Sequence, residues 1–132
     1  MNRAKRLWLI SVFILIFHSG CDLQPVFATE ITASWYSKQS LKNEGTWKYS
    51  KGIMANGELY NENKYTCANR IYPLGTMLKI TNISNGKSVI VKTTDRIGKR
   101  FAETRIDLSK SAFNKIENLN KGLTKVKVEV VK

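Results

Sequence analysis

The sequence is poor in the residues that much enzyme chemistry requires. It has one histidine, His18, and two cysteines, Cys21 and Cys67, among 132 residues. His18 lies in an N-terminal segment that we interpret below as an export signal, so the remaining chain lacks the histidine that Ser-His-Asp systems, Cys-His systems and His-ligated zinc sites need. Two cysteines also exclude a disulfide framework. Acid–base chemistry therefore falls to carboxylates, and we expect no metal and no cofactor.

Long apolar runs are missing as well. Leu7–Phe17 is interrupted only by Ser11 and follows three basic residues. This run is much shorter than the about 20 residues that a membrane-spanning helix needs, but it has the length of the apolar part of a secretory signal. We predict a signal peptide over residues 1–28, because Val26-Phe27-Ala28 places compact residues in front of a cleavage site.

A second interpretation of this segment stays open. Ser19-Gly20-Cys21 resembles a bacterial lipobox, in which a lipoprotein signal over residues 1–20 is removed and Cys21 is acylated. A buried acyl chain contributes about 0.8 kcal/mol per CH₂ to membrane binding. Under both interpretations the protein is exported to the bacterial cell envelope, in the periplasm or on the extracytoplasmic face. A lipid anchor at Cys21 is the only membrane contact that we expect.

Negative charge is scarce. The 22 Lys and Arg residues outnumber 10 Asp and Glu residues, which gives a net charge of +12, and removal of residues 1–28 leaves +10. Such a charge favours an anionic partner. We exclude nucleic acid, because the basic residues are scattered along the chain and an exported protein does not routinely meet it. An anionic polymer of the cell envelope fits better, and we expect a monomer.

Alternation of apolar and polar residues predicts several short strands. Ile31–Ser37 mixes β-branched and aromatic residues and predicts the first strand. The polar stretch Lys38–Gly57 has neither a helical nor a strand period, which predicts a long loop. Thr76–Asn82 and Ser88–Thr94 alternate on either side of Asn85-Gly86, a pair that favours a type I′ hairpin turn.

The rest of the chain predicts two more strands and one helix. Arg105–Leu108 is a short strand candidate, and Ser109 is a suitable N-cap for a helix that contains Ala112, Phe113 and Ile116. Lys125–Val131 alternates valines with charged residues, which is typical of a strand with one solvated face. Short strands with one helix indicate a single mostly-β barrel domain with α insertions.

Six short motifs occur in one order, and together they resemble a known family. They are Ala33-Ser34-Trp35-Tyr36, Ala55-Asn56-Gly57-Glu58, Pro73-Leu74-Gly75-Thr76, Thr81-Asn82 with Asn85-Gly86-Lys87-Ser88-Val89, Thr94-Asp95-Arg96 and Arg105-Ile106-Asp107-Leu108-Ser109. On these motifs the chain resembles the rare lipoprotein A family of septal lytic transglycosylases. Each motif alone is weak, but six in one order are specific, and they cover essentially all of residues 29–132.

The resemblance implies a fold and an activity. The fold is the six-stranded double-psi β-barrel shared with expansins and barwin-like proteins, mostly β with one or two short helices, over residues 29–132. The glycan-binding repeat domain of larger members is not expected after the barrel. The activity is endolytic cleavage of MurNAc-GlcNAc bonds in peptidoglycan glycan strands, which leaves 1,6-anhydro-MurNAc ends during cell wall remodelling. The family's important acidic residues map onto Glu58 and Asp95, and a third carboxylate, Asp107, matches its Asp-Leu-Ser motif.

The chain departs from the family pattern at three places. Asn69 occupies the position of a family histidine and cannot titrate. Asp95-Arg96 is followed by Ile97-Gly98-Lys99-Arg100-Phe101, where the family has Gly-Pro-Phe. The loop after Tyr36 is also longer than usual. These departures bear on proton handling and on the shape of the cleft.

The chemistry of this reaction suggests roles for the site residues. In a lytic transglycosylase the muramic acid's own 6-hydroxyl attacks C1, so one carboxyl serves first as acid and then as base, and no histidine is needed. We predict Asp95 as this general acid/base, and Glu58 as the carboxylate that stabilises developing positive charge or orients the sugar. Arg96 is predicted to bind a muramyl carboxylate, and Asn69 and Tyr60 to contact the glycan.

Two other functions stay open at this point. The missing histidine and the missing repeat domain fit an expansin-like module that binds wall polysaccharide without cleaving it. A secreted inhibitor or antimicrobial of barwin type is the third interpretation. Individual residues have alternatives too: Glu58, Asp95 and Asp107 can instead bond the backbone of turns, and Tyr60 can belong to the core.

Overall fold

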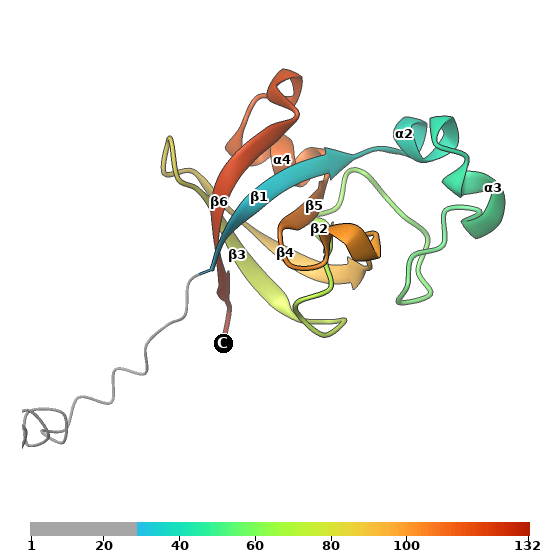
Figure 1. Cartoon of the computed structure of the whole chain (residues 1–132), viewed down its shortest axis with the longest axis horizontal. Helices are drawn as coiled ribbons and strands as arrows, with labels where there is room; N and C mark the ends of the chain where they lie inside the picture. The colour runs from blue at the N-terminus through green and yellow to red at the C-terminus, as the bar shows by residue number, and fades with distance from the viewer. Residues whose placement is uncertain (1–28) are drawn as a thin grey trace, which may run out of the picture.

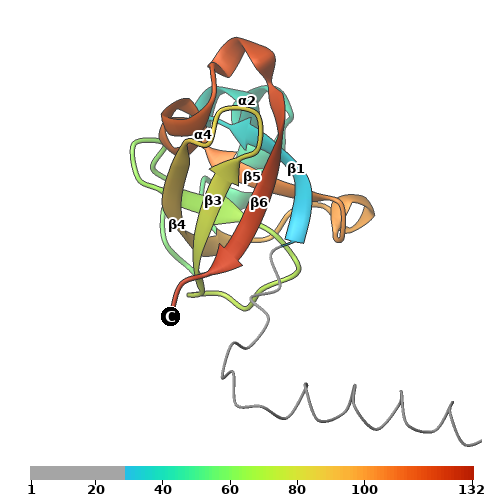
Figure 2. The same cartoon turned by 90° about the vertical axis from the view of Figure 1, so that its left-hand side faces the viewer.

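Six strands close into a barrel in the computed structural model, which describes residues 29–132. The predicted signal, its cleavage sites and Cys21 lie outside the described residues. Around the barrel the order is β1-β5-β2-β4-β3-β6 (Figures 1 and 2). β1 pairs with β5 and β2 with β4 in parallel, and the other neighbours are antiparallel. The strands are β1 Thr29–Tyr36, β2 Thr66–Ala68, β3 Met77–Asn82, β4 Ser88–Asp95, β5 Arg105–Ser109 and β6 Leu123–Val130. This confirms the predicted mostly-β, six-stranded barrel.

The barrel interior is filled by alternate residues of the strands, because successive side chains of a strand point to opposite faces. Leu78, Ile80, Val91, Val126 and Val128 are fully buried in this core. The helix α4, Lys110–Ile116, packs Ala112, Phe113 and Ile116 onto the same cluster. Its N-cap is Ser109, whose Oγ accepts a hydrogen bond from the Ala112 N–H at 3.4 Å, as the sequence predicts.

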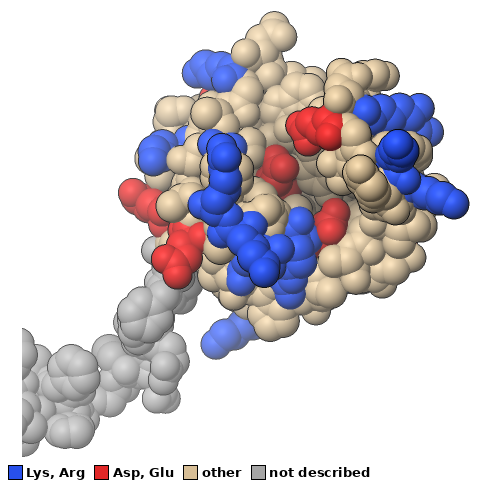
Figure 3. Space-filling model, turned by 45° about the vertical axis from the view of Figure 1, so that its right-hand side comes forward, with Lys and Arg blue, Asp and Glu red and all other residues tan. Residues whose placement is uncertain are grey.

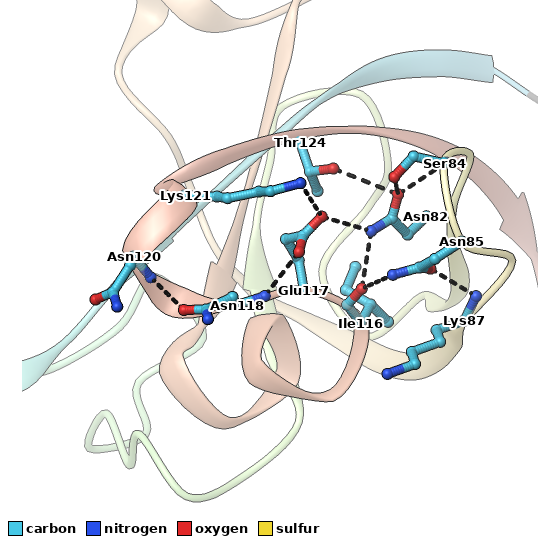
Figure 4. Close-up of polar contacts among 10 residues, drawn as sticks. All are labelled: Asn82, Ser84, Asn85, Lys87, Ile116, Glu117, Asn118, Asn120, Lys121 and Thr124. Carbon is cyan, nitrogen blue, oxygen red and sulfur yellow. Dashed lines mark hydrogen bonds and ion pairs between the residues drawn. The ribbon is translucent and has the colours of Figure 1, made fainter.

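A polar network ties the β3–β4 connection to the end of α4 (Figure 4). The Asn82 side chain is fully buried and donates from Nδ2 to the Ile116 carbonyl at 2.8 Å and to Glu117 Oε2 at 3.1 Å. Asn85 donates to the same carbonyl at 2.9 Å. The predicted type I′ turn is wrong, because that turn needs positive φ at both central residues and here Gly86 has φ +74 whereas Asn85 does not. Asn85 serves instead as a cap for α4.

The stretch after β1 is not the predicted loop. It forms two short helices, α2 Lys38–Asn43 and α3 Thr46–Ser50, which stand beside the barrel beyond the end of β1 (Figure 1). α2 begins with a capping box in which Ser37 and Ser40 bond each other's backbone N–H groups at 3.1 and 2.8 Å. None of the described helices is long and apolar enough to cross a membrane.

A second, smaller hydrophobic cluster lies outside the barrel core. It consists of Tyr36, Met54, Tyr60, Ala68 and Ile97. The rings of Tyr36 and Tyr60 stack with centroids 4.4 Å apart, and the Tyr60 hydroxyl donates to the Tyr36 carbonyl at 2.7 Å. This cluster holds the chain from α3 to Tyr60 against the outer face of the barrel, and thereby builds the walls of the cleft described next.

Candidate active site

Four strands present one residue each to a single row on the outer face of the barrel. In the pairing register Ser34 of β1 stands opposite Asp107 of β5, Asp107 opposite Ala68 of β2, and Ala68 opposite Asp95 of β4. Ile106 on β5 is buried in the core, so its neighbour Asp107 points outward. Two strand spacings separate the Cα atoms of Asp95 and Asp107, about 10 Å. The sheet therefore brings together two of the three predicted carboxylates.

The row forms the floor of a cleft of about 410 Å³. The cleft is lined by the row itself, by the helical segment after β1, by the chain up to Tyr60, by the residues that follow β4 and by the first residue of β5. The lining residues are Ser34, Trp35, Tyr36, Leu41, Glu44, Thr46, Ser50, Gly52, Ile53, Met54, Tyr60, Ala68, Asp95, Arg96, Ile97, Gly98, Arg105 and Asp107. Figure 3 shows a hollow with acidic side chains in and beside it and basic side chains on either side. The cleft thus has an acidic interior on a basic protein.

The Asp107 carboxyl on the cleft floor is partly withdrawn from water. Burial raises the pKa of Asp107 to about 6, and the hydrogen bond from Ser34 Oγ to Oδ1, at 2.8 Å, and the positive charge of Arg105 offset part of that rise. The negative charges of Glu44 and Asp95 raise it further. A carboxyl with this pKa exchanges its proton near neutral pH, which a general acid requires.

Asp95 is held in a fixed orientation by the backbone. Its Oδ1 accepts hydrogen bonds from the Arg96 N–H at 2.8 Å and from the Ala55 N–H at 3.0 Å. Its Oδ2 makes no hydrogen bond within residues 29–132, which leaves that oxygen for a bound molecule. The Ala55 contact also fastens the Ala-Asn-Gly-Glu turn to the end of β4.

Glu58 lies on that fastened turn but does not line the cleft. Its side chain is exposed, and its backbone N–H donates to Asn56 Oδ1 at 3.0 Å. The structure therefore places Glu58 at the margin, one turn away from Asp95.

Arg96 and Asn69 stabilise the loop beside β4. Arg96 lines the cleft, but its Nη1 donates to the backbone carbonyls of Asn69 and Tyr72 at 2.8 and 2.7 Å. Asn69 is fully buried and outside the cleft lining. Its Oδ1 accepts from the N–H groups of Ile71 and Tyr72, and its Nδ2 donates to Thr93 Oγ1 at 3.2 Å. Every polar atom of the Asn69 side chain is thus used inside the protein.

The two tyrosines of the smaller cluster form part of the cleft lining. Tyr60 is buried and its hydroxyl already has an acceptor, the Tyr36 carbonyl. Burial raises the pKa of Tyr36 far above its usual range, and its hydroxyl has no hydrogen-bond partner within residues 29–132. What Tyr60 presents to the cleft is therefore its ring, packed on Tyr36.

Two further charged residues of the cleft, Glu44 and Arg105, were not among the site residues predicted from the sequence. Glu44 is exposed, follows α2 and lines the cleft. Arg105 lines it from the start of β5. Glu44 has no distinguishing sequence signal, because it lies in a polar stretch without a period. Arg105 could have been found from its place in a strand two residues before Asp107. No group of three metal-ligating side chains occurs within the described residues.

The chain is similar in sequence to known proteins. A family model described as lytic transglycolase matches residues 28–128. The endolytic peptidoglycan transglycosylase RlpA of Pseudomonas aeruginosa is 41% identical over 98 residues, which cover 74% of this chain and 26% of that protein. The probable endolytic peptidoglycan transglycosylase RlpA of Treponema pallidum is 43% identical over 74 residues, 56% of this chain and 23% of that protein. The chain thus spans about a quarter of the length of these relatives.

Solved structures identify the barrel type. An expansin mutant of Clavibacter michiganensis in complex with cellohexaose superposes with a TM-score of 0.58 at 18% identity, covering 80% of this chain and 51% of the expansin. At this identity the likeness concerns the fold, which is the six-stranded double-psi β-barrel that the sequence resemblance implies. With the family model matched over most of the barrel, the chain belongs to the lytic transglycolase family.

Proposed function

We propose that this protein is an endolytic lytic transglycosylase that cleaves MurNAc-GlcNAc bonds of peptidoglycan glycan strands and leaves 1,6-anhydro-MurNAc ends. The observation that carries the proposal is the strand row with two carboxylates at the floor of one cleft, of which Asp107 has a pKa of about 6. The family membership and the relatives' names support the same activity. The site of action is the bacterial cell envelope, reached by export with or without lipidation at Cys21, and the protein acts as a monomer.

In this proposal the acid is Asp107. A glycosidic bond breaks through an oxocarbenium-like state when the leaving oxygen is protonated. Because burial keeps the pKa of Asp107 near 6, its proton is available at the pH of the reaction. After the proton has left, the Asp107 carboxylate takes the proton of the muramic acid 6-hydroxyl while that oxygen attacks C1. The carboxyl is then protonated again, so the cycle needs neither water nor histidine.

Asp95 is the second carboxylate of the proposed site. Two backbone N–H groups fix its Oδ1, and the remaining oxygen faces the positive charge that develops on the sugar. This differs from the assignment that the sequence favours, in which Asp95 is the acid. Glu58 orients sugar at the margin of the cleft, Arg96 contacts a polar group of the glycan with the nitrogens that remain free, and Tyr60 supports the sugar by its ring. Asn69 acts indirectly, because its side chain shapes the Asn69–Tyr72 loop to which Arg96 donates.

An expansin-like binding function is the second candidate. The observation in its favour is Asn69, which stands where the family has a titratable histidine and whose side chain is saturated by internal hydrogen bonds. Under this alternative the same cleft holds a glycan strand and no bond breaks.

The experiment that decides between the two is a search for anhydro products. The protein is incubated with purified glycan strands with and without stem peptides, and the products are analysed by mass spectrometry for 1,6-anhydro-MurNAc ends. We expect such ends from the wild type, a loss of at least a hundredfold in the Asp107→Asn and Asp95→Asn variants, and a smaller loss in Glu58→Gln.

Matched controls separate chemistry from folding. Glu103→Gln removes an exposed carboxylate that does not line the cleft and should act like the wild type. Binding of strands without anhydro ends in the wild type would favour the expansin-like function. Full activity in a folded Asp107→Asn protein would refute the assignment of the acid.

A further inference from the structure

We propose that Arg105, supported by Phe101, binds a carboxylate of the muramyl residue and thereby makes the cleft specific for acidic glycans over neutral ones. This inference rests on the proposed function, because it names the substrate chemistry that the same cleft selects. Nothing in the family comparison assigns a role to either residue.

The position of Arg105 follows from the strand period. Arg105 and Asp107 are two residues apart in β5, and the residues next to them, Ile106 and Leu108, are buried in the barrel core. Both side chains therefore leave the sheet on the outer face, with Cα atoms about 7 Å apart. Both line the cleft. A sugar whose linkage oxygen lies at Asp107 thus has Arg105 within reach of the groups on its ring.

The Arg105 guanidinium is held in place without using its donors. It lies over the Phe101 ring at 4.3 Å from the centroid, and Arg100 lies over the same ring at 4.7 Å. This cation–π contact restrains the guanidinium but leaves its N–H groups free for an acceptor. Phe101 itself is half-buried and packs against the smaller cluster, so the platform is fixed to the wall of the cleft.

The Arg105 charge acts on Asp107 from a distance, but its donors are not used within residues 29–132. Within residues 29–132 its guanidinium makes no hydrogen bond, and the ion pairs of these residues are Lys121 with Glu117 and Lys127 with Glu129. Arg96, by contrast, already donates from Nη1 to two backbone carbonyls. Of the two cleft arginines, Arg105 is therefore the one with its whole donor set available for a ligand.

The ligand that matches this group is a carboxylate. A planar guanidinium binds a carboxylate through two parallel N–H···O bonds, and such charge-assisted bonds are among the stronger ones in proteins. Muramic acid differs from the sugars of neutral polysaccharides by its lactyl carboxyl group. In denuded strands that carboxylate is free, and in peptide-bearing strands the carboxylates belong to the stem peptide, so both sources offer the same chemistry.

The test measures binding in an inactive background. The Asp107→Asn variant is titrated with denuded strands, with the same strands after their carboxylates have been converted to methylamides, with peptide-bearing strands and with chitin oligosaccharides. We expect at least tenfold tighter binding of denuded strands than of methylamide strands or chitin. Adding Arg105→Gln should bring this affinity ratio close to one, and adding Arg105→Lys should lower it only in part. If the protein prefers peptide-bearing strands and this preference depends on Arg105, the carboxylate that Arg105 binds belongs to the stem peptide.

Lys115→Gln in the same background is the matched control, because it removes one positive charge from an exposed position of α4 outside the cleft. The inference is refuted if Arg105→Gln leaves the ratio unchanged, or if Lys115→Gln lowers it equally. Wild-type assays for anhydro ends keep the two proposals apart. A ratio that depends on Arg105 without anhydro ends contradicts the cleavage reaction alone, whereas anhydro ends with an unchanged ratio contradict only the carboxylate site.

Discussion

Replacing Asp107 by Asn tests whether the floor of the cleft holds a carboxyl that resists ionisation. Burial raises the pKa of Asp107 from 3.8 to about 6 in the folded protein. In the unfolded chain the pKa of an Asp is near 3.9. A carboxyl with a raised pKa in the folded state supports folding below about pH 4, and this support is lost as the pH rises through 6. The wild type should therefore lose stability over this interval through Asp107, whereas Asn does not titrate.

The magnitude follows from the size of the shift. A shift of one pKa unit corresponds to about 1.36 kcal/mol of free energy, so a rise of the Asp107 pKa by about two units corresponds to about 3 kcal/mol. The Asn side chain has nearly the same shape and its Oδ1 can still accept the bond from Ser34 Oγ. We expect the stability of Asp107→Asn relative to the wild type to increase by about 3 kcal/mol between pH 3.5 and pH 7.5.

Urea unfolding of both proteins at several pH values measures this difference. Comparing the two proteins at each pH removes the contributions of all other titrating groups, which the proteins share. A difference that stays constant from pH 3.5 to 7.5 would refute a raised pKa. A difference that changes in the opposite direction would mean that Arg105 and Ser34 stabilise the Asp107 carboxylate more than burial destabilises it.

Three further predictions concern the pH dependence of the reaction, the buried Asn82 network and the packing of Trp47 on Gly52. If the protonated form of Asp107 is the acid, the rate at which anhydro ends form should fall as the pH rises above about 6, by roughly tenfold per pH unit, in a pH–rate profile. Asn82→Ala removes a buried side chain that bonds both Ile116 and Glu117, and should lower the free energy of unfolding by about 3 kcal/mol in urea titrations, whereas Asn120→Ala, at an exposed position, should change it by less than about 0.5 kcal/mol. Gly52→Ala places a Cβ 2.5 Å from two Trp47 ring carbons at a φ of +79, so it should displace Trp47 and change its fluorescence while the barrel stays folded.

Sequence alone predicts the long strands of this fold for a physical reason. Strands β3, β4 and β6 have one face in the core and one toward solvent, so the buried residues Leu78 and Ile80, Val89 and Val91, and Val126 and Val128 alternate with more exposed ones. Strand β2 was missed, because its three residues are all buried and show no alternation. It is recognised only by its partners β4 and β5, which come later in the chain.

The helices after β1 were missed for the opposite reason. Neither α2 nor α3 has a buried residue, so neither has an apolar face that a period could reveal. They are held by the Ser37–Ser40 capping box and by Trp47 against Gly52, which are contacts of particular atoms. For the same reason Glu44 escaped detection, and the desolvation of Asp107 is a property of the assembled cleft.

The strand row also determines when the site comes into existence during folding. Ser34 and Asp107 are 73 residues apart in the chain, and Ala55 and Asp95 are 40 apart, yet each pair is joined by one hydrogen bond. Parallel pairing of β1 with β5 and of β2 with β4 means that no hairpin contains two members of the row. Contacts of such long sequence separation form slowly, since loop closure precedes them. The cleft therefore forms only after these distant strands have paired, and a molecule whose barrel is not closed lacks the row of side chains on the cleft floor.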